Sequence, residues 1–353
     1  MEPNNRRTNK TRNIIQDSTF QAKFILSKNI KFFLHTIFLF LLLTLICNTA
    51  YCITNHEKIL ITVNKFISHP ALDAAEKGIM KTLKDRALIP NKVSIKLDNA
   101  QGNITNSIQI AKHHAAMAPR FMVAIATPAA QADFKAKLDT TVLAFAAVTD
   151  PTAAGISCSR EKVIGVTDQP PILELVEAVN KILPNTKVIG VIFNPGEINS
   201  VKMIEQIEKI AANNGIKVKK VTVTSSANVV VATQKLVHEA DLIYLPQDNT
   251  VISSIDSIIH ISARAKIPVI ANDPSLVDKG LLFAIGADYF SMGVQLGNMM
   301  ADLMEGKKLE NAIQEPNTKE IKINYKVADD LGIKIPDNIQ FNNNAQKAKV
   351  TNE

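Results

Sequence analysis

The chain has 353 residues, enough for two domains, and its 46% hydrophobic and 21% charged residues are typical of a folded protein and exclude wholesale disorder. The net charge of +7 is concentrated at the N-terminus, because residues 1–52 hold seven Lys/Arg and two acidic residues and leave only +2 for residues 53–353. A body this close to neutral lacks the basic surface typical of nucleic-acid binding, so we expect no nucleic-acid partner.

The first 52 residues combine a basic flank with an apolar run from Phe32 to Cys47, followed by small and polar residues. This pattern predicts a secretory signal peptide, with cleavage after Cys52, and therefore a periplasmic or extracytoplasmic protein. The alternative is an uncleaved membrane anchor through residues 32–47, although a spanning helix usually needs about twenty apolar residues. Cys158 is the one cysteine of the remaining chain, so the body folds without an internal disulfide.

From residue 57 onward, apolar segments with strand and helix periodicity alternate along the chain. Thr127 and Pro128 suit the N-cap and the first turn of one of the predicted helices. The first series is expected to run strand 58–66, helix 69–86, strand 92–100, helix 104–117, strand 121–126, helix 127–138 and strand 141–148.

A second series repeats this pattern in the other half of the chain. Its expected order is helix 170–183, strand 187–193, helix 199–215, strand 216–223, helix 227–240, strand 241–246, helix 249–266, strand 267–271, and a strand with a long helix behind it in 280–306. Strands that alternate with helices form parallel sheets covered on both faces. We therefore predict an α/β fold of two doubly wound parallel-sheet lobes, with a hinge and a cleft between them.

The predicted lobes define domain boundaries. We expect the chain to cross between the lobes near residues 167–171, 272–282 and 318–324, where turn residues separate the two series. The predicted organisation is a basic region plus signal peptide (1–52), a first lobe (53–168, with 281–318 returning to it), a second lobe (169–280, with about 319–335) and a polar tail (336–353).

Both series contain a strand that ends at an Asp-Pro pair, Asp150-Pro151 in the first and Asp273-Pro274 in the second. Ligands of open parallel sheets bind beyond the carboxyl ends of the strands. Asp150 and Asp273 are therefore expected to approach one ligand from opposite lobes. The alternative is that each pair only initiates a turn, because Asp accepts local backbone hydrogen bonds and Pro fixes φ.

The sequence resembles the ABC-transporter substrate-binding proteins of the tryptophan/tyrosine type over roughly residues 57–335. The resemblance is carried by segments that follow one another in order, among them "HPALDAAEKG" (69–78), "NAQGN" (99–103), "IATPAAQA" (125–132), "FAAVTDPTAAG" (145–155), "VIGVTD" (163–168), "LPNTKVIGVIFNPGEINS" (183–200), "LPQDNTVISS" (245–254) and "IPVIANDPSLVDKGLLFAIGADYFSMGVQLG" (267–297). It implies a type I periplasmic-binding-protein fold and an extracytoplasmic receptor that delivers a solute to a membrane permease with its ATPase. It also implies that the solute is a small polar metabolite, since the family's ligands are mostly amino acids, aromatic ones where they are identified. A small aliphatic amino acid or another polar metabolite is the alternative.

An amino acid needs hydrogen-bond donors for its carboxylate and acceptors for its ammonium group. Donors are expected at the start of helix 127–138, from the Thr127 hydroxyl and the free N–H groups of Ala129 and Ala130, because a helix N-terminus attracts anions. The acceptors are expected from Asp150 and Asp273 through charge-assisted hydrogen bonds.

The remaining candidate ligand-binding residues follow other predicted strands. Asp248 has an alternative role as the N-cap of the helix that begins at Asn249 or Thr250, and Tyr289 is a candidate to stack on a flat ligand. The set that we expect to line the cleft beside the residues above is Asn64, Gln101, Gln247, Asp248, Asn249, Thr250 and Tyr289.

Other function classes have less support in the sequence. There is no Gly-x-Ser-x-Gly elbow, no phosphate loop and no dinucleotide fingerprint after the first strand, so we expect no catalytic residue, no metal and no cofactor. We expect a monomer that binds its solute by hinge closure. The alternative is a membrane-anchored sensing domain of the same fold, and an enzyme with Asp150 and Asp273 as an acid/base pair is the third class.

Overall fold

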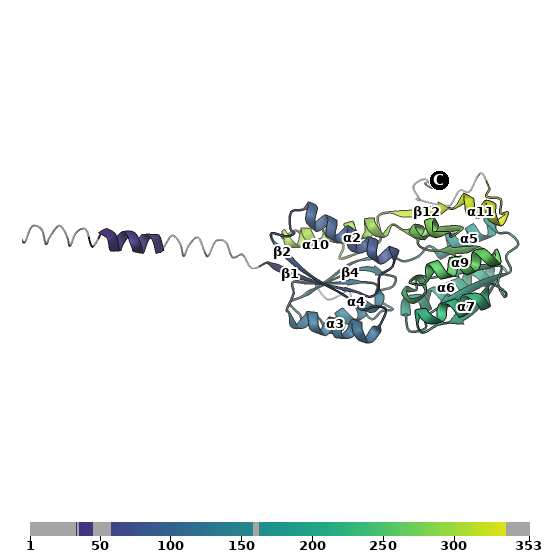
Figure 1. The fold of residues 1–353 in the computed structure, drawn as a ribbon, viewed down its shortest axis with the longest axis horizontal. Coiled ribbons are helices and arrows are strands. Elements are labelled where there is room, and N and C mark those ends of the chain that lie inside the picture. The colour runs from purple at the N-terminus through teal and green to yellow at the C-terminus, as the bar shows by residue number, and fades with distance from the viewer. Residues whose placement is uncertain (1–32, 34, 45–57, 158–161, 337–353) are drawn as a thin grey trace, which may run out of the picture. The chain divides into compact units, whose positions relative to one another are not determined.

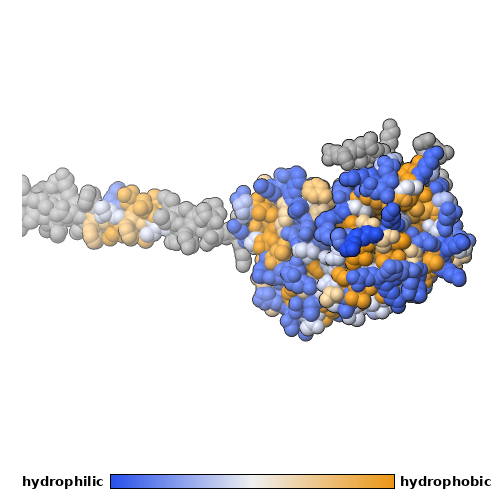
Figure 2. All heavy atoms as spheres, turned by 45° about the vertical axis from the view of Figure 1, so that its right-hand side comes forward, coloured by the Kyte–Doolittle hydropathy of each residue, from blue (hydrophilic) through white to orange (hydrophobic). Residues whose placement is uncertain are grey.

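The structure, a computed structural model, describes residues 33, 35–44, 58–157 and 162–336 (Figure 1). The chain divides into two units, Met1–Glu57 and Lys58–Glu353, and we call the second unit the body. In the first unit, residues 35–44 form a helix whose apolar side chains are exposed, and this helix is largely hydrophobic in Figure 2. None of the helices within the described residues has the length and hydropathy needed to cross a membrane. The predicted cleavage point after Cys52, Cys158 and most of the polar tail lie outside the described residues.

The first sheet of the body is entirely parallel, in the order β11-β5-β4-β3-β1-β2. Its strands are β1 (Ile59–Lys65), β2 (Val93–Asn99), β3 (Phe121–Ile125), β4 (Val142–Val148), β5 (Val163–Thr167) and β11 (Ile313–Gln314). The helices that accompany it are α2 (Pro70–Asp85), α3 (Ile104–Ala116), α4 (Thr127–Ala136) and α10 (Tyr289–Met304). Helices α2 and α10 pack together, as do α3 and α4, and Figure 1 shows the two pairs on opposite faces of the sheet.

The second sheet has the order β12-β10-β9-β8-β6-β7, and only the β10–β12 pair within it is antiparallel. Its strands are β6 (Val188–Phe193), β7 (Lys217–Thr222), β8 (Leu242–Leu245), β9 (Val269–Ala271), β10 (Phe283–Ala287) and β12 (Lys319–Ile323). The helical segments around it are α5 (Ile172–Ile182), α6 (Ile198–Asn213), η1 (Ser226–Asn228), α7 (Val229–Leu236), α8 (Asn249–Ile252), α9 (Ile255–Ala265), η2 (Pro274–Lys279) and α11 (Tyr325–Leu331).

Buried side chains of the second sheet alternate between two cores. On β8, Leu242 and Tyr244 belong to the core with α5, α6 and α11, whereas Ile243 and Leu245 belong to the core with α7, α8, α9 and η2. A strand points successive side chains to opposite faces, so an uninterrupted apolar strand fills both cores. The two-lobed α/β fold predicted from the sequence is confirmed by these two sheets.

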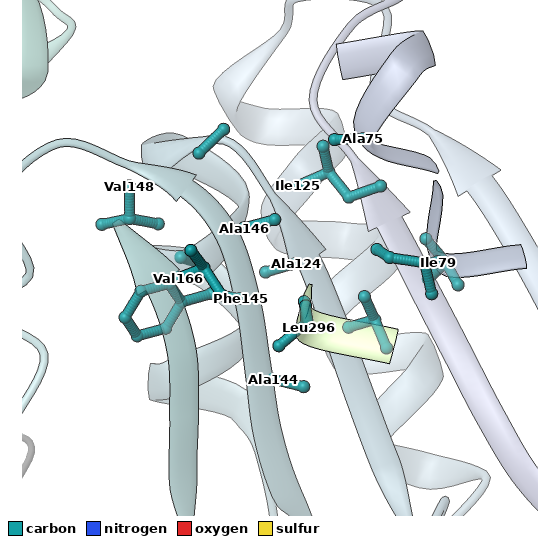
Figure 3. Packing of buried hydrophobic residues seen from close by; sticks show 14 of the residues in the cluster. Ala75, Ile79, Ala124, Ile125, Ala144, Phe145, Ala146, Val148, Val166 and Leu296 are labelled. Carbon is teal, nitrogen blue, oxygen red and sulfur yellow. The ribbon is translucent and has the colours of Figure 1, made fainter. Parts of the chain in front are cut away.

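Small side chains let α2 and α10 approach the first sheet and each other. Figure 3 shows Ala144 and Ala146 of β4 in the same core as Ile79 of α2 and Leu296 of α10. Where the two helices cross, a Cβ on Gly293 would lie 2.0 Å from the carbonyl oxygen of Ala75. The long predicted helix after residue 287 therefore belongs to the first lobe, as the expected return of the chain requires.

The positions at which the chain crosses between the sheets differ in part from the prediction. Residues 283–287 pair with β9 and β12 in the second sheet, so the chain returns to the first lobe at Asp288 and not at 281. Residues 272–282 lie entirely within the second lobe. The last crossing, between β11 and β12, falls in 315–318, because residues 319–323 already form β12. The sequence did not reveal these points because β10 and α10 form one apolar stretch.

Candidate functional site

A cavity lies between the two sheets at the carboxyl ends of their strands. The first lobe contributes the start of α2, the ends of β4 and β5 and the start of α10 to its wall. The second lobe contributes the segments that follow β8 and β9 and one residue of α6. The lining residues are His69, Ala71, Leu72, Ala147, Thr149, Asp168, Asn199, Leu245, Pro246, Gln247, Asp248, Asn249, Ile252, Ala271, Asn272, Asp273 and Tyr289.

Asp168, Tyr289 and Gln247 form a hydrogen-bonded network at one end of this cavity. The Tyr289 hydroxyl donates to Oδ2 of Asp168 over 2.9 Å, and Thr149 Oγ1 donates to Oδ1 over 3.0 Å. From the second lobe, Nε2 of Gln247 donates to the Asp168 carbonyl (2.8 Å) and to the Tyr289 hydroxyl (3.0 Å). Burial raises the pKa of Asp168 to about 6, and burial also raises the pKa of Tyr289 well above 10. The network therefore connects the two lobes beside a buried carboxyl group.

Asp273 is the second buried carboxyl group of the cavity. Its Oδ1 accepts hydrogen bonds from the backbone N–H (2.9 Å) and the hydroxyl (2.7 Å) of Ser275, so it caps η2. Its Oδ2 is buried and has no partner. Burial raises the pKa of Asp273 to about 6, and the nearby Asp168 and Asp288 raise it further. The turn-forming role and a ligand-facing role are thus divided between the two oxygens of one side chain.

Further buried acceptors without a partner lie among the lining residues, namely Oε1 of Gln247 and Oδ1 of Asn199. Nδ1 of His69 is a third such acceptor. Nε2 of His69 lies 3.2 Å from Oδ1 of Asn249, and this oxygen is an acceptor because Nδ2 of the same amide donates to Glu197. Nε2 therefore carries the proton, which leaves Nδ1 as the acceptor. Burial lowers the pKa of His69 to about 4, so its imidazole is neutral near pH 7. A buried acceptor without a partner is costly, which indicates that donors from a bound molecule complete this site.

The start of α4 lies between two parts of the cavity wall. Strand β3, which leads into α4, is flanked in the sheet by β1 and β4, and the segments after these two strands supply His69 and Thr149. The hydroxyl of Thr127 at this helix N-terminus is buried and has no partner. Ala129 and Ala130 are fully buried there, and the N–H of Ala130 is not free as predicted, because it donates to the carbonyl oxygen of Ala126 over 3.0 Å. The N-terminus of α4, where we predicted hydrogen-bond donors, therefore lies at the edge of the first sheet that faces the cleft. None of its residues lines the cavity in this conformation.

The polar residues after β8 are held by a buried glutamate that the sequence analysis did not single out. Glu197 accepts hydrogen bonds from the backbone and side chain of Asn249 and from the backbone and side chain of Thr250. Asp248 caps α8 by accepting from the N–H of Val251 at 3.0 Å, the alternative role that the sequence left open. Burial raises the pKa of Asp248, and Glu197 raises it further. These contacts fix the segment that carries Gln247 and Asn249 into the cavity.

Seven of the twelve predicted residues lie away from the cavity wall: Thr127, Ala129 and Ala130 at the start of α4, Thr250, which is bonded to Glu197, and Asn64, Gln101 and Asp150. Asn64 is fully buried inside the first lobe, where its Nδ2 donates to Asp133 (2.9 Å) and to Ser107 (3.2 Å). Gln101 is exposed in a turn with a positive φ of 56°. Oδ1 of Asp150 accepts from the N–H of Ala153 over 2.9 Å, which is the turn-forming role. We had expected both Asp-Pro pairs to reach the cavity, but only Asp273 lines it.

Of the predicted set, the cavity wall contains Gln247, Asp248, Asn249, Asp273 and Tyr289. The sequence analysis missed Asp168, His69 and Asn199. Asp168 could have been predicted from the sequence, because it follows strand β5 as Asp150 follows β4. Asn199 lies in the first turn of α6 and resembles a capping residue in the sequence, so the sequence did not predict its position in the cavity wall.

Residues 60–347 match the family described as "ABC transporter substrate binding protein". The chain belongs to this family. Its members and the structural neighbours below are solute-binding proteins and not enzymes. No group of three or more His, Cys, Asp or Glu side chains arranged to hold a metal ion occurs in the part of the chain that the structure describes.

Individual members of the family are similar over most of this chain. A tyrosine-binding protein of Clostridioides difficile is 33% identical over 254 residues, which are 70% of this chain and 73% of that protein. An ABC domain from Streptococcus pneumoniae, solved in complex with L-Trp, is 29% identical, with a TM-score of 0.75 over 80% of this chain and 97% of that one. A ligand-free, open substrate-binding protein from Clostridium difficile is 31% identical, with a TM-score of 0.59 over 82% of this chain and 99% of that one.

Proposed function

We propose that this ABC transporter substrate-binding protein is the extracytoplasmic receptor of an importer and binds an amino acid in the cavity between its lobes. The observation that carries the proposal is that both lobes place buried hydrogen-bond acceptors without a partner in the cavity wall. A tyrosine-binding relative and a neighbour in complex with L-Trp support an aromatic side chain. The apolar residues Leu72, Ala147 and Ile252 offer that side chain a wall.

The two charged ends of the amino acid are assigned to opposite sides of the cleft. The ammonium group binds at Asp273 and Gln247, whose free oxygens are acceptors. The carboxylate binds at the N-terminus of α4, where the Thr127 hydroxyl is buried without a partner and the helix end attracts anions. Tyr289 orients the buried carboxyl of Asp168 by its hydrogen bond.

Binding proceeds by hinge closure at the three chain crossings. Hydrogen bonds from Gln247 to Asp168 and from His69 to Asn249 join the lobes in this conformation. The higher TM-score with the L-Trp complex than with the open, ligand-free relative supports a closed arrangement here. The solute shifts the population by its greater affinity for the closed form, which then contacts a membrane permease and its ATPase. We further propose a monomer exported by an N-terminal signal.

A thermal-shift screen of the purified protein against the twenty amino acids tests this function. We expect one or a few amino acids to stabilise the protein by about 2.7 kcal/mol at a hundredfold excess over Kd. Asp273→Ala should lose this stabilisation, whereas the matched variant Asp150→Ala should keep it, because Asp150 does not line the cavity. If no amino acid raises Tm and mass spectrometry of the native protein detects no bound amino acid, the proposed function is wrong.

A further inference from the structure

Ile198, the first residue of α6, packs against the core of the first lobe although α6 belongs to the second lobe. The other isoleucines of this helix pack in the core of the second lobe, and they are Ile204, Ile207 and Ile210. Two residues before Ile198, a Cβ on Gly196 would lie 3.9 Å from Cδ1 of Ile104 in α3, so the backbone closely approaches the first lobe. The start of α6 therefore contacts the first lobe through apolar atoms.

The segment that carries Ile198 is held firmly by the second lobe. Nδ2 of Asn194 donates to Oγ1 of Thr250 over 3.0 Å, and Oδ1 of Asn194 accepts from the N–H of Gly196 over 2.9 Å. The side chain of Glu197 makes no cap hydrogen bond for α6, and its two carboxylate oxygens instead accept from N–H groups at the start of α8. Ile198 therefore moves with the second lobe as part of one rigid body.

The residue after Ile198 connects this segment to the cavity. Asn199 lines the cavity, its Nδ2 donates to the carbonyl oxygen of Gln247 over 2.6 Å, and its buried Oδ1 has no partner. The side chain of Gln247 in turn donates to Asp168 and Tyr289 of the first lobe. A solute that donates to Oδ1 of Asn199 therefore binds the residue next to Ile198.

We infer that Ile198 is an apolar latch between the lobes: it leaves water and packs into the first lobe on closure, and it sets how long the solute stays bound. The inference rests on the proposed function and adds a residue that controls closure without lining the cavity. Opening the cleft returns the Ile198 side chain to water, and exposure of apolar surface is unfavourable. The latch thus stabilises the closed form relative to the open form.

The latch predicts a change in solute dissociation rather than in folding. Ile198→Ala removes three carbon atoms from a half-buried contact, so we expect Kd to rise about tenfold, mostly through faster dissociation. Ile198→Val removes one carbon atom and should raise Kd only about twofold. The Tm of the solute-free protein should stay close to that of the wild type, because Ile198 is not part of the core of its own lobe.

Ile210→Ala is the matched control for the loss of packing. Ile198 and Ile210 are both half-buried isoleucines of α6, but Ile210 packs against the core of the second lobe. We expect Ile210→Ala to lower Tm and to leave both the dissociation rate and the separation of the lobes unchanged. The two variants thereby distinguish closure from stability.

Two measurements test the latch. Stopped-flow kinetics give the dissociation rate of L-tryptophan, L-tyrosine or another amino acid that raises Tm in the screen. Spin labels report the separation of the lobes without any solute, at Gln109→Cys in α3 and Gln234→Cys in α7, in a protein whose native cysteines are replaced by serine. Both positions are exposed and outside the cavity wall, and Figure 1 shows α3 and α7 along the same edge of the body. Without solute, pulsed electron paramagnetic resonance should give a longer mean distance for Ile198→Ala than for the wild type.

The outcomes distinguish the latch from the proposed function. If an amino acid binds and Ile198→Ala changes neither its dissociation rate nor the distance between the labels, the latch is wrong while the receptor function stands. A fall in Tm as large as that of Ile210→Ala, with dissociation as in the wild type, also contradicts the latch, because that is the behaviour of a purely structural residue. If no amino acid binds the wild type, the proposed function is wrong, and the spin-label distances still decide whether Ile198 holds the lobes together.

Discussion

Burial raises the pKa of several aspartates in the body, and the partners of each carboxyl group determine its role. Asp168, Asp248 and Asp273 all line the cavity, and Asp248 and Asp273 also cap α8 and η2. Asp133 lies inside the first lobe, where its Oδ1 accepts from Asn64 over 2.9 Å and its Oδ2 has no partner. Burial raises the pKa of Asp133 well above its ordinary value, and the hydrogen bond from Asn64 only partly opposes this.

The raised pKa of Asp133 predicts a pH dependence of stability. The folded protein holds this proton more tightly than the unfolded chain does, so the free energy of unfolding falls as pH rises from about 3.9 to the raised folded pKa. Asp133→Asn has no proton to lose. As pH rises, we expect the free energy of unfolding of Asp133→Asn to increase relative to that of the wild type, by on the order of 1 kcal/mol. Urea unfolding at several pH values measures this difference.

Asp133→Leu is the control for the hydrogen bond alone. It removes the acceptor of the Asn64 amide and should cost about 1–3 kcal/mol in free energy of unfolding relative to Asp133→Asn. Parallel pH profiles for the wild type and Asp133→Asn would show that ionisation of Asp133 does not limit stability.

At the scale of elements, the packing of α2 against α10 decides where the start of α10 lies. Glycines on both helices allow the backbones to touch: a Cβ on Gly78 would lie 2.2 Å from the carbonyl oxygen of Phe290, and one on Gly293 would lie 2.0 Å from that of Ala75. Asp288 caps α10 by accepting from the N–H groups of Phe290 and Ser291. This contact thereby fixes Tyr289, the first residue of α10, beside the cavity.

Gly293→Ala tests this contact. Backbone atoms cannot yield as a flexible side chain would, so we expect overpacking to lower the free energy of unfolding by about 1–3 kcal/mol or more. Thermal unfolding measures the loss. Lys77→Ala, an exposed position on α2, is the control and should change stability by less than about 0.5 kcal/mol. Equal Tm values for the two variants would mean that the helices can separate at no cost.

At the scale of the whole molecule, contacts between the lobes set the balance between open and closed forms. His69 precedes α2 in the first lobe and Asn249 begins α8 in the second, and their side chains lie 3.2 Å apart. Ile198 of α6 also packs against the core of the first lobe. Because His69 is neutral down to about pH 4, its contact with Asn249 should not respond to pH near neutrality.

His69→Ala tests the role of this contact in closure. A hydrogen bond contributes about 0.5–1.5 kcal/mol, so its loss from the closed form should weaken solute affinity about two- to tenfold and increase the open population. Small-angle scattering should then give a larger radius of gyration for the solute-free variant than for the wild type. His113→Ala, exposed on α3, is the control. Unchanged scattering and affinity in His69→Ala would mean that other contacts hold the lobes together.

The sequence by itself determined the alternation of strands and helices, and with it the two lobes and the strand ends that meet at the cleft. Periodicity is a local property, and an apolar strand between two helices has few alternative folds. Local chemistry also predicted the cap at Asp248, because a cap involves neighbours in sequence. Tertiary structure was not needed for these features. The predicted cap at Thr127 is wrong: Thr127 is the first residue of α4, and its hydroxyl makes no cap hydrogen bond.

Only the tertiary structure decided which polar residues face the cavity. Asp150 and Asp273 each precede a proline at a strand end, yet only Asp273 lines the cavity, while Asn64 turns toward Asp133, 69 residues away. Likewise, β10 joins the second sheet and α10 the first, although the two elements are one apolar stretch. The direction of a side chain at a strand end depends on partners distant in sequence, and no local pattern encodes those partners.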